Sequence, residues 1–245
     1  MRSVLGLDGC PTGWVAVWLV DGAVSEVAVV DDVAAALAHR RVTRIGVDMP
    51  VGLVDGLRDT DAAARARLPG RASSVFSTAP RTVVEGWRDG ALTTHAAASA
   101  AAVRVTGQGL SQQAWRLVPK MAEVEAAAAA AAGTRLTEVH PELAFATVAG
   151  GPLPRKRSWP GVRERDRVLR GLGVRLPHRF PRDTEAAPDD VLDAAVCAWV
   201  ADGLAGAPGR IERVPGRTAQ RAHGRPIVIT VRHREGGPLR RRPAA

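Results

Sequence analysis

The chain has 245 residues, 46% of them hydrophobic, and carries two cysteines and a formal net charge of +9. That hydrophobic content suffices for a folded core and excludes a wholly disordered chain, and two cysteines exclude the disulfide framework of a small secreted domain. We expect no signal peptide and no membrane span, which would need an apolar run of roughly 18 residues, and therefore a cytoplasmic protein without a membrane partner.

The N-terminal part of the chain is expected to open an α/β fold. Short apolar runs between turn residues predict strands, and the alanine-rich run behind Asp31 and Asp32 predicts a helix. In chain order these are strands at 3–8, 14–20 and 24–30, a helix reaching about residue 40, and a strand at 42–47. This order begins the RNase H-like fold, a central mixed five-stranded sheet flanked by helices.

The middle of the chain is expected to hold a helical insertion at about 50–133, after the fourth strand. Its alanine-rich stretches favour helices. The remaining elements are helices at about 61–65, 91–104 and 111–132, a fifth strand at 135–139, a charged helix at 161–172, a proline-rich linker at 177–188, a closing helix at 189–204, and a candidate edge strand at 226–231 before a disordered end. We therefore expect one RNase H-like domain over 1–205 and a basic extension over 206–245.

The basic charge is concentrated in two segments. Residues 155–183 carry a net charge of +7 and residues 204–245 a net charge of +8, which leaves −6 for the remainder. Basic segments beside an acidic body would suit a phosphate-rich polymer that approaches an acidic site. A solvated tail and a solvated helix face would explain the same segregation, so both interpretations stay open.

Acidic residues stand at the ends of predicted strands and in the closing helix. Asp8 and Asp48 each end an apolar run, and Glu142 follows a third run. Asp190 and Asp193 are three residues apart in the closing helix and so share a face. A buried ionised carboxylate is costly unless it is paired or bound to metal. Converging carboxylates here would hold divalent cations, which prefer oxygen ligands.

Most of these acids also have a structural interpretation. Asp8 and Asp48 could begin turns, where Asp is common. Asp190 could cap the closing helix and interact with its dipole, an explanation that suits Asp193 less well.

A third group of candidates lies around the fifth strand. Strand alternation would place Glu138, His140 and Glu142 on one face, unless Pro141 interrupts it. One of the three could serve as a ligand or general base, whereas His140 could equally be a structural histidine.

Six groups of residues occur in a fixed order along about residues 3–203. They are Gly6-Leu7-Asp8-Gly9-Cys10 with Gly13-Trp14, Val47-Asp48-Met49-Pro50-Val51-Gly52-Leu53, Gly70-Arg71 to Pro80-Arg81, Gln113-Ala114-Trp115 to Pro119-Lys120, Glu138-Val139-His140-Pro141-Glu142, and Asp189-Asp190 to Asp193-Ala194. In this order they resemble the family catalogued as domain of unknown function 429, predicted RNase H-like nucleases. The last group also resembles the final helix of Holliday-junction resolvases.

The resemblance implies a metal-dependent nuclease that hydrolyses phosphodiester bonds of DNA or RNA. Under this hypothesis Asp8, Asp48 and Asp193, helped by Asp190 or Glu142, hold two Mg²⁺ or Mn²⁺ ions that activate water and stabilise the leaving 3′ oxygen. Candidate substrate-binding residues are Arg71, Ser73, Ser74, Arg81, Lys120 and His140, whose polar groups could contact phosphate. Ordinary loop polarity would also explain these residues. Trp14 and Trp115 could stack on bases, but packing in the core is the more natural role for both.

Two other classes of function remain open. One is a non-catalytic module that binds nucleic acid or protein on the same fold, since a fold does not fix a function. The other is a nucleotide-dependent phosphotransferase, because Asp8-Gly9-Cys10-Pro11-Thr12-Gly13 has some likeness to a phosphate loop. Neither a second such loop nor a glycine-rich adenosine motif is present in the sequence.

Overall fold

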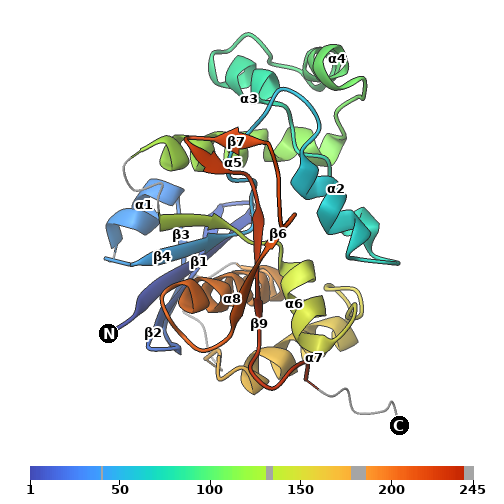
Figure 1. Cartoon of the computed structure of the whole chain (residues 1–245). Helices are drawn as coiled ribbons and strands as arrows, with labels where there is room; N and C mark the ends of the chain where they lie inside the picture. Colours follow the sequence, from blue (N-terminus) through green and yellow to red (C-terminus); the bar gives the residue numbers. More distant parts are fainter. Residues whose placement is uncertain (40, 131–134, 178–185, 240–245) are drawn as a thin grey trace. The chain divides into compact units, whose positions relative to one another are not determined.

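The computed structural model describes residues 1–39, 41–130, 135–177 and 186–239 (Figure 1). Parts of the linker predicted at 177–188, and the last residues of the predicted helix at 111–132, lie outside the described residues, as does the end of the chain beyond residue 239. Within the described residues no helix is both long enough and apolar enough to cross a membrane.

A five-stranded sheet confirms the predicted fold class. Its strands are β1 (Ser3–Cys10), β2 (Gly13–Val20), β3 (Ala23–Val30), β4 (Arg44–Val47) and β5 (Leu136–Glu138), in the spatial order β3-β2-β1-β4-β5. β1 to β3 form an antiparallel meander, whereas β4 is parallel to both β1 and β5. This mixed sheet with flanking helices is consistent with an RNase H-like fold.

The burial of each strand follows from its place in the sheet. β1 and β2 lie inside the sheet and are apolar along nearly their whole length, as strands covered on both faces must be. β3 is an edge strand, and its first four residues alternate between exposed and partly buried. The centre of the sheet is therefore shielded from water, and β1 carries Asp8 into that interior.

Four helices accompany the sheet: α1 (Val33–His39), α6 (Pro141–Ala149), α7 (Trp159–Gly171) and α8 (Pro188–Leu204). Helix α8 packs on β1, β2 and β4 and is buried along most of its length (Figure 1). α6 and α7 pack against α8 in turn. The predicted closing helix is thus the central helix of this layer.

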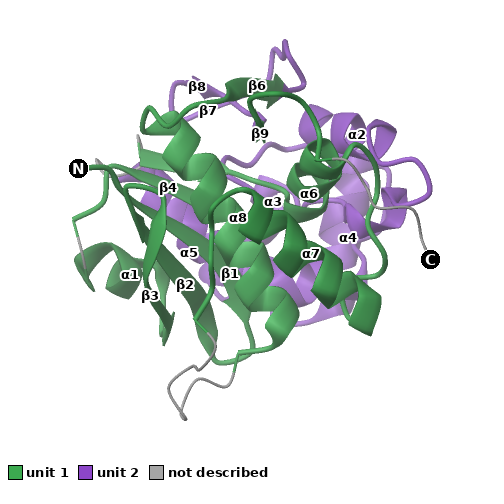
Figure 2. Cartoon of the chain, turned by 90° about the horizontal axis from the view of Figure 1, so that it is seen from below, with its two compact units in different colours: residues 1–48, 135–213, 230–245 green, residues 49–134, 214–229 purple. Residues whose placement is uncertain are grey.

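The chain divides into two compact units (Figure 2). The first comprises residues 1–48, 135–213 and 230–245, and the second comprises residues 49–134 and 214–229. Both are assembled from separated segments, whereas the predicted division into 1–205 and 206–245 follows the order of the chain and stays a prediction.

The second unit contains the helical insertion that we predicted after the fourth strand. Its elements are α2 (Asp59–Ala66), the 3₁₀ helix η1 (Ala72–Ser74), α3 (Arg81–Arg88), α4 (His95–Thr106), α5 (Gln112–Ala129) and the hairpin strands β7 (Arg221–Ala222) and β8 (Arg225–Pro226). α3 packs on α4 and α5. The sequence interpretation contained no helix at the position of α3.

Two further strands lie beyond the five-stranded sheet. β6 (Arg210–Val214) and β9 (Ile229–His233) form a separate two-stranded sheet. The segment predicted as an edge strand at 226–231 therefore overlaps β9, but it pairs with β6 and adds nothing to the edge of the central sheet. The reason is that β6, which the sequence interpretation lacked, offers it a partner.

Candidate acidic site

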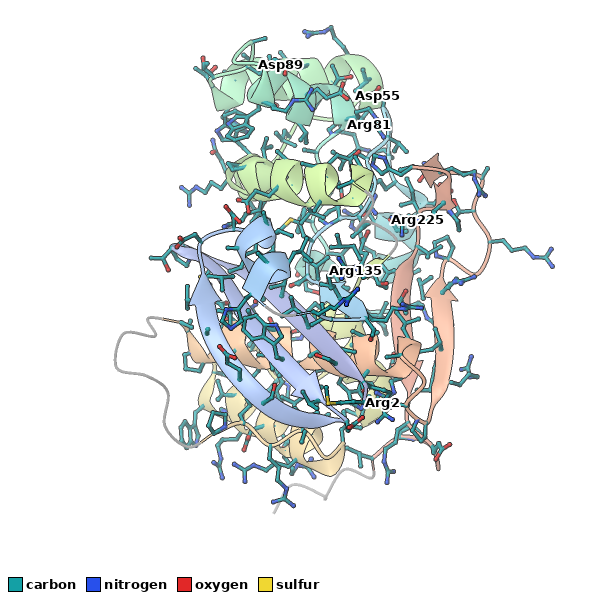
Figure 3. The ribbon with its side chains drawn as sticks, turned by 90° about the vertical axis from the view of Figure 1, so that its left-hand side faces the viewer. Arg2, Asp55, Arg81, Asp89, Arg135 and Arg225 are labelled. Carbon is teal, nitrogen blue, oxygen red and sulfur yellow. The ribbon has the colours of Figure 1, made fainter. Side chains whose placement is uncertain are left out.

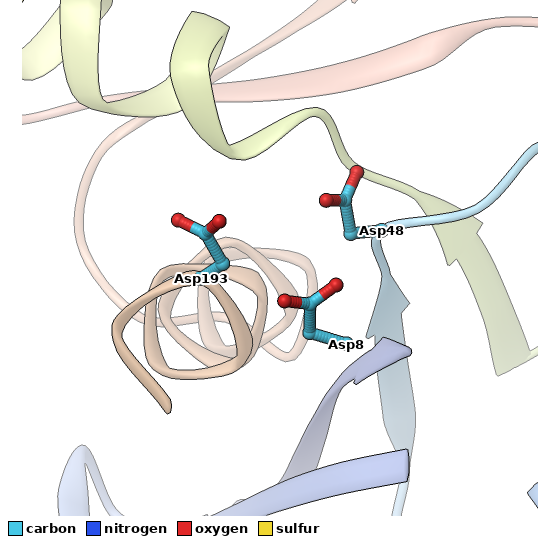
Figure 4. Close-up of side chains that lie close together, drawn as sticks. All are labelled: Asp8, Asp48 and Asp193. Carbon is cyan, nitrogen blue, oxygen red and sulfur yellow. The ribbon is translucent and has the colours of Figure 1, made fainter. Parts of the chain in front are cut away.

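Two of the predicted site residues are placed by neighbouring parallel strands. Asp8 lies near the end of β1, and Asp48 directly follows β4. β1 and β4 run parallel with Leu7 opposite Val47, and the Asp48 amide donates a hydrogen bond to the Leu7 carbonyl at 2.9 Å. Because parallel strands end at the same edge of a sheet, the two carboxylates emerge side by side (Figure 4).

Asp193 reaches them because α8 lies directly on the sheet. Gly6 and Gly46 stand opposite each other in β1 and β4. A Cβ atom on Gly6 would lie 2.0 Å from the carbonyl oxygen of Ala194, and one on Gly46 would lie 2.3 Å from that of Cys197. The glycines therefore leave the space that the α8 backbone occupies, a close approach that a side chain would prevent.

The three carboxylates form one cluster. One oxygen from each of Asp8, Asp48 and Asp193 lies within 4.8 Å of the others, and the side chains converge from two strands and a helix (Figure 4). Asp8 is 6% exposed, Asp193 is 2% exposed and Asp48 is half-buried. Three anions at this separation, in a medium of low polarity, repel one another strongly.

The pKa values of the three carboxyls are raised, first by burial and, for Asp8 and Asp48, next by neighbouring carboxylates. Burial, and next the carboxylate of Asp193, raises the pKa of Asp48 to about 8. Burial, then Asp48 and Asp193, raises the pKa of Asp8 well above its ordinary range. Burial raises the pKa of Asp193 to about 6 although Lys156 opposes it. The cluster therefore needs positive charge to be fully ionised near neutral pH.

Lys156 supplies part of that charge and was missed in the sequence interpretation. Its Nζ lies 2.6 Å from Asp193 Oδ2 and 3.6 Å from Asp189 Oδ2. Burial lowers the pKa of Lys156, but Asp193 and Asp8 outweigh that effect and raise it above its ordinary value. One signal was available, because the chain has only one other lysine, Lys120, among its 34 basic residues.

Asp190 and Asp189 lie in the first turn of α8, at the margin of the cluster. Burial, and then Asp189, raises the pKa of Asp190, and Asp190 in turn contributes to the raised pKa of Asp8. Asp190 is not among the three carboxylates that meet within 4.8 Å. Of the two candidate acids on this helix, Asp193 is the one that faces Asp8 and Asp48.

Pro141 interrupts the strand alternation of Glu138, His140 and Glu142, the exception that the prediction allowed. β5 ends at Glu138, and α6 begins at Pro141 with His140 as its N-cap. The His140 Nδ1 accepts a hydrogen bond from the Leu143 amide at 3.3 Å. Proline is favoured in the first turn of a helix because it lacks an amide hydrogen there, so it starts a helix here instead of continuing the strand.

Glu142 is engaged by a buried arginine. It lies in the first turn of α6 and accepts a hydrogen bond from Arg165, whose side chain is fully buried. Glu142 nevertheless contributes to the raised pKa values of Asp48 and Asp193 and so lies near the cluster. Its predicted catalytic role is untested, and its charge already has a partner.

The residues predicted to bind phosphate lie in the second unit, except for His140. Ser73 and Ser74 belong to η1, and the Ser74 hydroxyl donates to the Arg71 carbonyl at 2.7 Å. Arg81 begins α3 near Asp55 (Figure 3) and contacts Glu125 at 3.1 Å. Lys120 lies in α5, 3.7 Å from Glu123. Their role toward substrate stays a prediction, and of the two tryptophans Trp14 is fully buried in the core.

Comparison with known proteins finds one family. A family model described as "Protein of unknown function (DUF429)" matches residues 6–220, a span that includes Asp8, Asp48, Lys156 and Asp193. No curated protein and no solved structure matches the chain.

Proposed function

We propose that this chain, which belongs to the family of proteins of unknown function DUF429, is a metal-dependent nuclease that hydrolyses phosphodiester bonds. The observation that carries the proposal is the convergence of Asp8, Asp48 and Asp193 within 4.8 Å at a buried edge of the sheet. Burying three ionised carboxylates together costs free energy unless cations neutralise their charge.

The donor set fits Mg²⁺ or Mn²⁺. All three groups offer carboxylate oxygens, the ligands that these hard cations prefer, and neither a thiolate nor an imidazole belongs to the set. The raised pKa values of Asp8 and Asp48 support the same conclusion, because they express a demand for positive charge that Lys156 meets only in part. A divalent cation bound there would supply Lewis-acid activation of water and of a phosphate oxygen. Two ions remain the expected number.

The residues of the chain then have separate roles. Asp8, Asp48 and Asp193 would hold the cations, and the close packing of α8 on the sheet keeps Asp8 and Asp193 shielded from bulk water. The Lys156 ammonium lies within reach of the same space and can donate to a non-bridging phosphate oxygen. In the reaction, a water oxygen forms a bond to phosphorus and releases one proton to solvent, the bond from phosphorus to the 3′ oxygen breaks, and that oxygen leaves with a proton taken from solvent.

The test is a cleavage assay on end-labelled DNA, RNA, DNA–RNA hybrid and branched substrates, with Mg²⁺, Mn²⁺ or EDTA. We expect cleavage with either cation, none in EDTA, and none by Asp8→Asn. Asp89→Asn is the matched control, since Asp89 is exposed and lies in the second unit. Absence of cation-dependent cleavage on every substrate by folded wild type, or cleavage by Asp8→Asn at the wild-type rate, would contradict the proposal.

A non-catalytic binding module is the second candidate. The observation in its favour is the 2.6 Å contact from Lys156 to Asp193, which resembles a structural ion pair. Such a module would bind nucleic acid equally well with cation or EDTA and would turn over no substrate.

A further inference from the structure

Trp159 is a large side chain that the fold leaves in solvent. It is 76% exposed, whereas Trp14 and Trp18 are completely buried. It opens helix α7, and the helix N-terminus is fixed by Ser158, whose Oγ accepts a hydrogen bond from the Gly161 amide at 3.2 Å. The Trp159 ring is therefore not part of the hydrophobic core, and the capped first turn of α7 fixes the backbone that carries it.

Arginine side chains accompany the exposed ring. The Arg163 guanidinium carbon lies 5.7 Å from the centre of the Trp159 ring, within the range of a cation–π contact. Arg157, two residues before the tryptophan, has a side chain that is 83% exposed. An aromatic ring with basic side chains near it is the combination by which proteins bind unpaired bases and their phosphates.

The second half of α7 differs from this first turn. Arg167 pairs with Glu164, and Arg170 pairs with Asp166 at 2.9 Å. These pairs neutralise the helix beyond the ring. Arg163, by contrast, lies against the Trp159 ring, and the Arg157 side chain is mostly exposed although its Nε contacts Asp189.

The ring also lies close to the acidic cluster. Lys156 contacts Asp193 at 2.6 Å, and Arg157 Nε contacts Asp189 Oδ2 at 3.3 Å. Trp159 is three residues beyond Lys156, so their Cα atoms are at most about 11 Å apart. A strand held at the ring is thus within a few nucleotides of Asp193.

A hollow of about 280 Å³ adjoins the ring. Its lining includes Trp159, Val162, Arg163, Leu176 and Val191, and it is mostly apolar. Pockets for drug-sized ligands are typically about 300–1,000 Å³. The hollow therefore offers an apolar recess beside the ring, slightly smaller than such a pocket.

We propose that Trp159, with Arg157 and Arg163, forms a stacking platform for an unpaired base, and that the substrate is a single-stranded or locally unpaired nucleic acid strand. This inference rests on the proposed nuclease function, because it makes the platform the place where the strand is held for the acidic cluster. In a continuous duplex each base is already stacked on its neighbours and cannot lie on a protein ring without being extruded. The platform therefore favours unpaired strands.

The test measures binding separately from cleavage. A fluorescein-labelled 12-nucleotide DNA strand, the same RNA strand and the corresponding 12-base-pair duplex are titrated by fluorescence anisotropy in EDTA. The variants are Trp159→Ala, Trp159→Phe and, as a control, Val103→Ala, whose side chain is 48% exposed in α4. Because Trp159 is mostly exposed, its replacement should leave the fold intact, which circular dichroism checks.

We expect Trp159→Ala to weaken binding of the single strands roughly fivefold to 150-fold, the loss associated with one stacked base. Trp159→Phe should retain most of the affinity, Val103→Ala should bind as wild type does, and duplex binding should be nearly unchanged. Three outcomes would contradict the proposed platform. They are unaltered single-strand binding by Trp159→Ala, an equal loss of duplex binding by that variant, and no binding of any strand by wild type.

The two proposals can fail separately. Cation-dependent cleavage by wild type, together with unaltered single-strand binding by Trp159→Ala, leaves the nuclease in place and removes the platform. Loss of strand binding in Trp159→Ala, together with no cleavage by wild type under any condition, leaves a single-strand binding site and removes the nuclease.

Discussion

Two aspartates on helix α8 are buried nine residues apart, in surroundings of opposite charge. Asp202 lies 3.1 Å from Arg2 and 3.6 Å from Arg232, so two guanidinium groups compensate one carboxylate. Asp193 faces the carboxylates of Asp8 and Asp48 and has Lys156 as its closest cation among the described residues.

The difference shows that burial alone does not distinguish a structural carboxylate from a candidate ligand. Asp193 is 2% exposed and Asp202 is 3% exposed. At Asp202 the fold brings its own counter-charges, among them Arg232, whose guanidinium also lies 4.3 Å from the centre of the Trp199 ring. At Asp193 the fold gathers like charges and leaves a deficit of positive charge, which a bound cation would remove.

The largest effect, a loss of stability, is expected when Asp202 is replaced, because two arginines pair with its carboxylate. Asp202→Asn removes the charge that Arg232 needs, and breaking one partner of a buried ion pair costs about 3–5 kcal/mol. Chemical denaturation should show this loss, whereas Asp89→Asn, an exposed change of the same type, should be nearly neutral. Per folded molecule, cleavage by Asp202→Asn should equal that of wild type, and a selective loss of cleavage would place Asp202 in the site.

The second largest effect, a loss of cleavage, is expected when Asp193 is replaced. Asp193→Asn removes one of the three proposed ligands, and we expect cleavage to fall by more than about 100-fold, since even outer-shell partners of a metal site cost about 10- to 100-fold. Unlike Asp202→Asn, it should not destabilise the metal-free protein by several kcal/mol, because it also relieves repulsion. Initial rates and urea denaturation in EDTA test both statements, and strong destabilisation would make Asp193 a structural residue.

Gly46→Ala tests how closely α8 must approach the sheet. Its new Cβ would lie 2.3 Å from the Cys197 carbonyl oxygen, so the helix backbone must move, at a cost of about 1–3 kcal/mol. We expect Mn²⁺ to raise the melting temperature of wild type and to have little effect on this variant. Gly171→Ala in α7 is the control, because its Cβ meets only the end of the Leu239 side chain, at 3.0 Å. Equal responses to Mn²⁺ would contradict the argument.

The stability of the metal-free protein should fall as the pH rises from about 4 to about 8. The unfolded chain releases the Asp48 proton near its ordinary pKa of 3.8, whereas the folded chain retains it up to about pH 8. Between these values the folded state binds more protons, so the stability from this group is greatest at the acidic end and is lost toward pH 8. We expect at least about 1 kcal/mol, or about 2–4 °C in melting temperature.

Melting temperatures in EDTA from pH 5 to pH 8, compared between wild type and Asp48→Asn, isolate this contribution from that of other carboxylates. The difference between the two proteins should shift in favour of the variant as the pH rises. A constant difference would mean that Asp48 ionises normally in the folded chain.

The smallest effect, a change in Mn²⁺ affinity, is expected when Lys156 is replaced. The side chain is 34% exposed, so its ion pair with Asp193 is screened and contributes at most about 1 kcal/mol. Because the ammonium competes with a cation for Asp193, Lys156→Met should tighten Mn²⁺ binding by up to about tenfold, or about 1.4 kcal/mol. Calorimetric titration measures this change, with Lys120→Met as the control. Weaker Mn²⁺ binding would assign Lys156 a supporting role for the cation instead.

Local patterns in the sequence determined the elements that carry the site. The apolar runs that end at Asp8 and Asp48 predicted two strands, and the structure places both carboxylates at one sheet edge. Alternation and turn residues are local properties, and they define a strand without knowledge of its partners. Helices α3 and α6 and strand β6 were missed. In α3, Val83, Val84 and Gly86 are weak helix formers, the start of α6 was interpreted as strand, and the partner of β6 is β9, which is distant in sequence.

Only the tertiary structure decided which acids meet and what charge they face. Asp190 and Asp193 share a helix face in the sequence, but the crossing of α8 over Gly6 and Gly46 brings Asp193 to the cluster. The pairing of Glu142 with Arg165 and the contact of Lys156 with Asp193 join residues 23 and 37 positions apart. The net charge around a buried carboxylate depends on residues that are distant in sequence, and local sequence patterns do not show which of them will be neighbours.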